Sequence, residues 1–320
     1  MPDPKPTVLI ARRIPKSGRA RIAERCELRE GGLDATPELL RELAQGVAEI
    51  VADPTVAVGP ELLDAAGPQM RLVANFAVGY DNIDLDACRE RGVLATNTPD
   101  VLTDATAELA LALTLAAARA TGAAEARLRN GEWTGLDPTG HLGAELSGAT
   151  FGTIGMGRIG RRYAELIRPL AGTLLYSSRN AKPDAERELG AARVDLDQLL
   201  SDSDVISLHA AASPETAGLI GAPQLARMRR GSILVNTARG SLVDSAALAT
   251  ALRQGNIGAA GLDVYEHEPE VPAELLDAPN CVLLPHVGSA TVAARDGMAR
   301  LVADAVLAVL DGRAPEHRVA

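Results

Sequence analysis

Arg239, Glu268 and His286 each come shortly after a short apolar run in the second half of the sequence. In an open parallel sheet, ligands bind outside the carboxyl ends of the strands, so side chains that follow strands can meet at one site. An arginine, a carboxylate and a histidine together can bind an anionic substrate and exchange a proton with it. Glu266 and Glu270 remain alternatives to Glu268, because residues two apart on an extended segment share a face.

A glycine-rich turn precedes this set in the chain. Residues Gly155–Gly160 read GMGRIG, follow the apolar run 149–154 and open a helical pattern over residues 158–167. In this context the first glycine makes a tight turn, the second lets the backbone approach a pyrophosphate, and the third allows close packing of helix and strand. The turn therefore predicts a dinucleotide site rather than a mere glycine turn of an α/β domain.

The segment about 20 residues further on indicates which dinucleotide is bound. Dinucleotide sites that hold a free ribose 2′-hydroxyl carry an acidic residue there. This chain instead has Tyr176–Asn180, with sequence YSSRN, and Lys182 shortly after. Hydroxyls and an arginine can bind a 2′-phosphate, which a carboxylate would repel. We expect NADP(H) as the preferred cofactor, with NAD(H) as the alternative if Arg179 only points to solvent.

The elements that must position these residues alternate between short apolar strands and helices. Apolar runs recur at residues 8–11, 50–52, 72–74 and 93–95, and a second series of strands is expected in the ranges 149–154, 173–177, 205–209, 232–236, 259–263 and 282–284. Continuous apolar strands alternating with helices are typical of parallel sheets that are covered on both faces. Long helices are expected over 102–120, which is too apolar for a surface helix, and over 291–310. The fold class is therefore α/β, with two doubly wound parallel-sheet domains.

Composition narrows the function classes. The chain has 320 residues, 47% of them hydrophobic, and a net charge of −10, so we expect no nucleic-acid partner and no attraction to anionic lipid. The longest apolar run, 109–118, is about half the roughly 20 residues that a membrane span needs, and no signal peptide is recognised. Three widely spaced cysteines fit a reduced compartment and no metal site. We expect a cytoplasmic protein.

Two further segments extend these motifs into a resemblance over nearly the whole chain. Residues 75–84 read NFAVGYDNID and residues 101–108 read VLTDATAE. Together with the glycine turn and the segments that carry Arg239, Glu268 and His286, these residues resemble the D-isomer-specific 2-hydroxyacid dehydrogenase family. Within that family the chain most resembles the glyoxylate/hydroxypyruvate reductase branch. The resemblance implies a flavodoxin-like substrate domain (1–98 and 288–320), an inserted NAD(P)-binding Rossmann domain (99–287), a homodimer, and an active site in the interdomain cleft.

The resemblance also implies a role for each catalytic residue. His286 would be the general acid that protonates the carbonyl oxygen of a small 2-oxo acid, and Glu268 would hydrogen-bond His286 and favour its charged form. Arg239 would polarise the carbonyl and anchor the substrate carboxylate, which the backbone amides of Val78 and Gly79 would also hold.

Cofactor contacts follow from the same resemblance. The residues expected at the pyrophosphate are Gly155, Met156, Gly157, Arg158 and Ile159. Those expected at the 2′-phosphate are Ser178, Arg179 and Asn180. Asp263 is expected at the nicotinamide carboxamide. The other residues expected to contact the cofactor are Thr237, Ala238, Arg239, His286 and Gly288.

One departure from the family pattern concerns substrate size. Several hydroxypyruvate reductases carry a tryptophan at the position of Leu136, where it reaches into the partner subunit's pocket, so a 2-oxo acid bulkier than glyoxylate could fit here. Rival functions are a phosphite-type dehydrogenase and a non-catalytic, nicotinamide-responsive binding protein related to corepressors. A formate enzyme is disfavoured, because it would have glutamine in place of Glu268.

Overall fold

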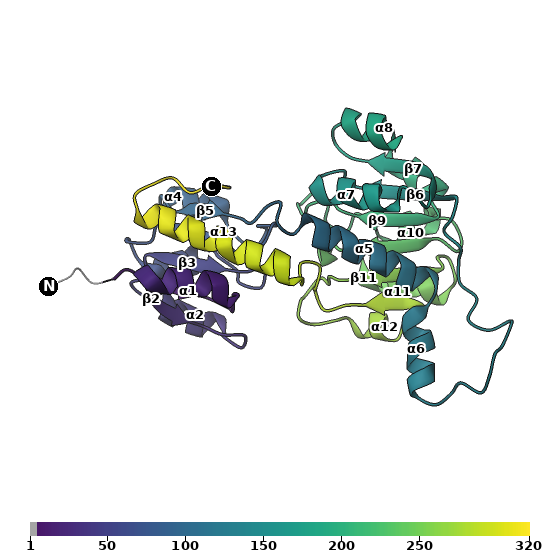
Figure 1. Ribbon diagram of the computed structural model, residues 1–320, viewed down its shortest axis with the longest axis horizontal. Coiled ribbons are helices and arrows are strands. Elements are labelled where there is room, and N and C mark those ends of the chain that lie inside the picture. Colours follow the sequence, from purple (N-terminus) through teal and green to yellow (C-terminus); the bar gives the residue numbers. More distant parts are fainter. Residues whose placement is uncertain (1–4) are drawn as a thin grey trace. The chain divides into compact units, whose positions relative to one another are not determined.

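The computed structural model describes residues 5–320, which form two compact units (Figure 1). The first unit runs to Leu102 and also includes Ser289–Ala320, and the second unit comprises Thr103–Gly288. The second unit is thus an insertion in the first. The sequence placed these borders at residues 98/99 and 287/288.

The first unit is a five-stranded parallel sheet with helices on both faces. Its strands, in sheet order, are β2 (Glu27–Glu30), β1 (Thr7–Ile10), β3 (Glu49–Ala52), β4 (Leu72–Asn75) and β5 (Leu94–Thr96). Its helices are α1 (Lys16–Arg25), α2 (Pro37–Ala44), α3 (Pro60–Ala66), α4 (Leu85–Glu90) and α13 (Val292–Leu310). The order 2-1-3-4-5 is that of flavodoxin-like folds, which confirms the expected class.

One face of this sheet packs against α2, α3 and α4. Leu9, Ile50 and Val73 share one core cluster with residues of α2, α3 and α4. The last helix, expected over 291–310, is α13, and Thr291 caps its first turn by accepting a hydrogen bond from the Ala294 amide (3.1 Å). Helix α13 packs beside α1.

The second unit has a seven-stranded parallel sheet. Its strands, in sheet order, are β12 (Cys281–Leu283), β11 (Ala259–Leu262), β10 (Ile233–Asn236), β9 (Val205–Leu208), β6 (Ala149–Ile154), β7 (Ala171–Ser177) and β8 (Ala192–Arg193). Its helices are α5 (Thr103–Ala118), α6 (Thr121–Arg129), α7 (Arg158–Ile167), α8 (Pro183–Leu189), α9 (Leu196–Asp202), α10 (Ala222–Arg227), α11 (Ser245–Arg253) and α12 (Ala273–Leu276), with a 3₁₀ turn at Gly240–Leu242. The strand order reverses at β6 and β9, the point at which such folds bind nucleotides.

Helix α5 is a core helix of this unit, as its apolar sequence indicated. Its Ala110, Leu113 and Ala117 are buried in a cluster with Phe151 and Tyr163. Among the described residues no single helix is long and apolar enough to cross a membrane, and the α5–α6 pair, which passes by length and composition, is bent by 67°.

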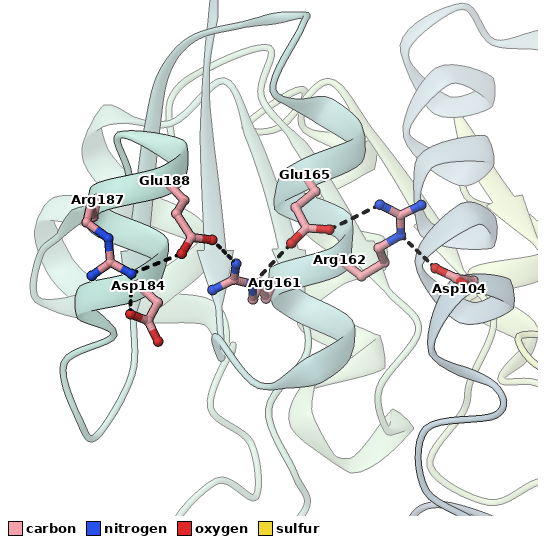
Figure 2. Close-up of polar contacts among 7 residues, drawn as sticks. All are labelled: Asp104, Arg161, Arg162, Glu165, Asp184, Arg187 and Glu188. Carbon is pink, nitrogen blue, oxygen red and sulfur yellow. Dashed lines mark hydrogen bonds and ion pairs between the residues drawn. The ribbon is translucent and has the colours of Figure 1, made fainter.

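Surface ion pairs fasten three helices of the second unit to one another. Figure 2 shows a chain of contacts from Asp104 on α5 through α7 to α8. The residues in it are Asp104, Arg161, Arg162, Glu165, Asp184, Arg187 and Glu188. An exposed ion pair contributes only about 0–1 kcal/mol to the free energy of unfolding. The network links α7, the helix after the glycine turn, to α8, the helix after β7.

One buried acid stands out in the first unit. Glu49 begins β3, its side chain is fully buried, and neither carboxylate oxygen has a hydrogen-bond partner among residues 5–320. The nearest cation is Arg71, whose Nη2 lies 3.9 Å from Oε1. Burial raises the pKa of Glu49 to about 8, against the opposing charge of Arg71, so the carboxyl group is protonated at neutral pH.

A hydrogen-bonded group connects α5, α7 and β9 in the second unit. The Tyr163 hydroxyl lies 2.9 Å from the Thr114 hydroxyl, and the Tyr163 ring centroid is 5.0 Å from that of His209. His209 Nε2 lies 2.9 Å from Ser207 Oγ. Burial lowers the pKa of His209 to about 3, so this ring is neutral and supports the backbone next to the glycine turn.

Candidate active site

The glycine turn between β6 and α7 has the geometry of a phosphate cradle. Gly155 has φ +91°, and a Cβ on it would lie 2.7 Å from the backbone of His209, so only glycine fits. A Cβ on Gly160 would lie 2.1 Å from the Gly155 oxygen, which shows how closely helix and strand pack. A Cβ on Gly157 would enter open space, and no side chain caps α7 there. The helix N-terminus is thus free to bind an anion.

The end of β7 contains no carboxylate. Ser178 is half-buried and its hydroxyl donates to the Asn180 carbonyl (2.7 Å), whereas Arg179 and Asn180 are exposed. These residues can hold a 2′-phosphate on the surface of the unit. Thr237, after β10, has a buried Oγ1 with no partner among the described residues, which fits a polar contact to a cofactor.

His286 and Glu268 form the closest polar pair of the expected catalytic set. His286 Nδ1 lies 2.6 Å from Glu268 Oε2, and Glu268 Oε1 accepts the Tyr265 amide at 3.0 Å. Burial by itself raises the pKa of Glu268, but His286, the Tyr265 amide and the charge of Arg239 together outweigh it, and the pKa is lowered overall. The carboxylate is therefore ionised. Glu266 and Glu270 are exposed, so the structure pairs Glu268 with the histidine.

Asp263 holds the backbone on both sides of the His286 side chain. Its carbonyl accepts the His286 amide (2.9 Å), and its carboxylate oxygens accept the amides of Val287 (2.8 Å) and Gly288 (2.7 Å). Three hydrogen bonds from one residue fix His286 at φ +53°, a conformation that is costly for a residue with a side chain. Burial raises the pKa of Asp263 against the lowering effect of these amides.

A tight contact between two loops places Arg239 at the same edge of the sheet. A Cβ on the next residue, Gly240, would lie 1.9 Å from the Tyr265 carbonyl carbon. The backbone after β10 therefore lies against the backbone that precedes Glu268. The Asn236 side chain braces Arg239 by donating to its carbonyl (2.8 Å), and the charge of Arg239 contributes to the lowered pKa of Glu268.

Comparisons with known proteins agree with this geometry. A family model described as "D-isomer specific 2-hydroxyacid dehydrogenase, NAD binding domain" matches residues 111–288. A glyoxylate reductase of Thermococcus litoralis is 44% identical over 98% of this chain and 97% of its own length. The chain belongs to this family.

Solved structures extend the family relationship to the whole fold. A Thermus thermophilus protein has a TM-score of 0.92 and 39% identity, covering 98% of this chain and all of that one. An NADPH-dependent glyoxylate/hydroxypyruvate reductase of Sinorhizobium meliloti, solved with NADP and malonate, has a TM-score of 0.86 and 34% identity. It covers 99% of this chain, and 97% of its own length is matched.

Two sets of expected substrate contacts were not used in building the His286 site of this dehydrogenase-family chain. Val78 and Gly79 belong to the first unit, where their carbonyls accept the side chains of Asn97 and Asn75, both at 2.8 Å. Leu136 lies between α6 and β6 and is 91% exposed. The substrate roles of Val78, Gly79 and Leu136 stay predictions.

Several supporting residues of this family member had no distinct signal in the sequence. Asn236 and Gly240 flank Arg239, and Tyr265 precedes Glu268 by three positions. Only their position close to the predicted residues could have indicated them, because neighbouring residues must hold a strand end that carries a catalytic group in place. Nothing in the sequence alone pointed to His209 and its partners.

Proposed function

We propose that this chain reduces a small 2-oxo acid, of the glyoxylate or hydroxypyruvate type, to the D-2-hydroxy acid with NADPH as the preferred reductant. The observation that carries the proposal is the 2.6 Å contact between His286 and an ionised Glu268, with Arg239 on the adjoining loop. This set lies in the same unit as a glycine turn with the geometry of a pyrophosphate site.

The chemistry needs a proton donor and an anion anchor. A bound nicotinamide would supply the hydride that reaches C2 of the oxo acid. The carbonyl oxygen then needs a proton, which His286 donates from the ring nitrogen opposite Nδ1 while Glu268 stabilises the charged ring. The Arg239 guanidinium binds the substrate carboxylate and stabilises negative charge on the carbonyl oxygen.

A turnover assay tests this function. Purified protein is given NADPH with glyoxylate, hydroxypyruvate and larger 2-oxo acids, and phosphite with NADP⁺ serves as the rival substrate. We expect turnover of the 2-oxo acids, and a roughly 10²–10⁴-fold lower kcat in His286→Ala with NADPH binding kept. Turnover of phosphite alone would favour a phosphite dehydrogenase. Cofactor binding without any turnover would favour a binding protein.

The cofactor preference is supported by the side chains after β7 and by the absence of a carboxylate there. A charge-assisted hydrogen bond from Arg179 to a 2′-phosphate is worth about 1.5–3 kcal/mol, or roughly 10- to 150-fold in affinity. Arg179→Ala should lower kcat/KM for NADPH by about that factor and leave the value for NADH unchanged. Ser178→Asp should invert the preference. Equal use of both cofactors by the wild type would refute the NADP(H) assignment.

The same proposal includes a homodimer in the cytoplasm. Helix α6 has no buried residue, and four large apolar side chains on it and after it are exposed: Leu128, Trp133, Leu136 and Leu142. Burial of these side chains by a second copy would remove them from water. A solution mass of one chain, measured by light scattering at micromolar concentration, would refute the dimer. Leu136 is proposed to line the substrate pocket of the partner copy.

A further inference from the structure

The segment after β7 that carries Ser178 and Arg179 is held by an arginine from the neighbouring strand. Arg193 lies in β8, whose two residues pair with β7 so that Tyr176 is opposite Arg193. The two hydrogens of Arg193 Nη2 are donated to two carbonyl oxygens, that of Ser178 at 3.0 Å and that of Arg179 at 2.9 Å. One guanidinium nitrogen therefore fixes two consecutive peptide groups.

The other end of this segment is fastened as well. The Lys182 amide donates to the Tyr176 hydroxyl at 2.7 Å, and that hydroxyl donates to Glu186 on α8 at 2.5 Å. Helix α8 is in turn tied to α7 by the ion pairs of Figure 2. The contacts of Arg193 thus complete a segment whose opposite end is already anchored to its own unit.

The direction of the two carbonyls determines what the segment presents on its other side. A peptide group is planar and trans, so its N–H points opposite to its C=O. Because Arg193 draws the carbonyls of Ser178 and Arg179 toward itself, the amides of Arg179 and Asn180 point the opposite way. Neither amide has an acceptor among the residues that the structure describes. Consecutive amides that point to the same side can together bind an anion there.

We infer that Arg193 is a positioning residue that makes this segment selective for a 2′-phosphate, acting through the backbone of Ser178–Asn180 rather than through contact with the ligand. The inference rests on the proposed NADP(H) preference and goes beyond it. The Arg179 side chain would contact the phosphate directly, and Arg193 sets the peptide groups on both sides of Arg179. A binding site organised before the ligand arrives loses less free energy on ordering.

The test uses two small probes that differ at the 2′ position, adenosine 2′,5′-bisphosphate and adenosine 5′-monophosphate. Their dissociation constants are measured by calorimetry for the wild type and for Arg193→Met. We expect the variant to bind the bisphosphate roughly 5- to 30-fold more weakly and the monophosphate within about twofold of the wild type. In kinetics, KM for NADPH should rise while kcat stays unchanged.

Two further variants separate geometry from charge and from general damage. Arg193→Lys keeps the positive charge but not the planar fork, so it should recover only part of the bisphosphate affinity. Arg253→Met is the matched control, because Arg253 is another exposed arginine of this unit that donates to a carbonyl, that of Glu274, at 2.7 Å. It should bind both probes normally.

The outcomes distinguish the inference from the proposal beneath it. Full recovery by lysine would assign the effect to charge and overturn the positioning role. An equal loss for both probes in Arg193→Met would show a structural defect only, and would also overturn it. If the wild type binds both probes equally well, the NADP(H) preference fails and the role of Arg193 fails with it. If the wild type discriminates and Arg193→Met discriminates equally, only the inference about Arg193 is wrong.

Discussion

Replacement of Glu268 by glutamine removes one charge and one acceptor at the centre of the site. The two carboxylate oxygens serve two different donors, the Tyr265 amide at 3.0 Å and His286 Nδ1 at 2.6 Å. A glutamine has a single acceptor oxygen, so one donor loses its partner and faces an amide NH₂ group instead. Glu268→Gln therefore weakens the stabilisation of the charged imidazole ring.

The size of the effect follows from the geometry. A hydrogen bond to a charged partner is worth about 1.5–3 kcal/mol, and about 1.4 kcal/mol corresponds to one pH unit. The side chains of His286 and Glu268 are 33% and 22% exposed, so solvent screening favours the lower end of this range. The charge of His286 lowers the pKa of Glu268, and this attraction is mutual, so its loss disfavours the charged ring that donates the proton. We expect the alkaline limit of 2-oxo acid reduction to move down by about one unit.

The assay is kcat/KM for the best 2-oxo acid, with saturating NADPH, from about pH 5 to about pH 10. Glu266→Gln and Glu270→Gln are matched controls, because both side chains are exposed and carry the same charge. Their profiles should match that of the wild type. A Glu268→Gln profile with an unmoved alkaline limit, or an equal shift in either control, would refute the pairing as the source of acid catalysis.

Three other perturbations give expected outcomes of different kinds. Glu49 keeps its proton up to about pH 8 in the folded chain but loses it near pH 4.5 in the unfolded chain. The free energy of unfolding should therefore fall as the pH rises from 4.5 to 8, by up to about 1.4 kcal/mol per pH unit. Glu49→Gln should abolish that fall in denaturant titrations. His209 has the opposite sign: it binds a proton near pH 6.5 only when unfolded, so stability should fall as pH drops from 6.5 toward 3, and His209→Gln should flatten this slope in the same titrations. Gly240→Ala should lower kcat/KM by roughly 10²-fold, because its Cβ forces the Tyr265 backbone away, whereas Gly221→Ala, whose Cβ would meet no atom closer than 3.6 Å, should be silent in the same assay.

The apolar strands and the helix after the glycine turn could be predicted from sequence alone. Parallel strands covered on both faces need continuous apolar residues, and β6 and α7 match their expected bounds, 149–154 and 158–167. Strand β2 had no such signal. It is an edge strand with sequence ELRE, whose charges blunt an open sheet edge rather than enter a core.

The site could be predicted as a set of residue types, but not as a set of contacts. The sequence left Glu266, Glu268 and Glu270 open, because spacing alone cannot show which carboxylate turns toward the histidine. That choice depends on the backbone path around Tyr265, which long-range packing against Gly240 determines. Arg193 could not be identified from the sequence for a similar reason, because its proposed role depends on the pairing of the two-residue strand β8 with β7.

The insertion of one unit into the other also bears on how this chain folds. The first unit must join residues up to Leu102 with residues from Ser289 onward, and closing so long a loop of unfolded chain costs about 5 kcal/mol. Within the second unit, however, a Cβ on Gly288 would lie 3.5 Å from Thr106, so the chain enters and leaves at neighbouring points. Once the second unit has folded, the loop is already closed. The folded second unit thus holds the two parts of the first unit close together. A variant that slows folding of the second unit should therefore delay both units, whereas a variant that slows folding of the first unit should delay only that unit.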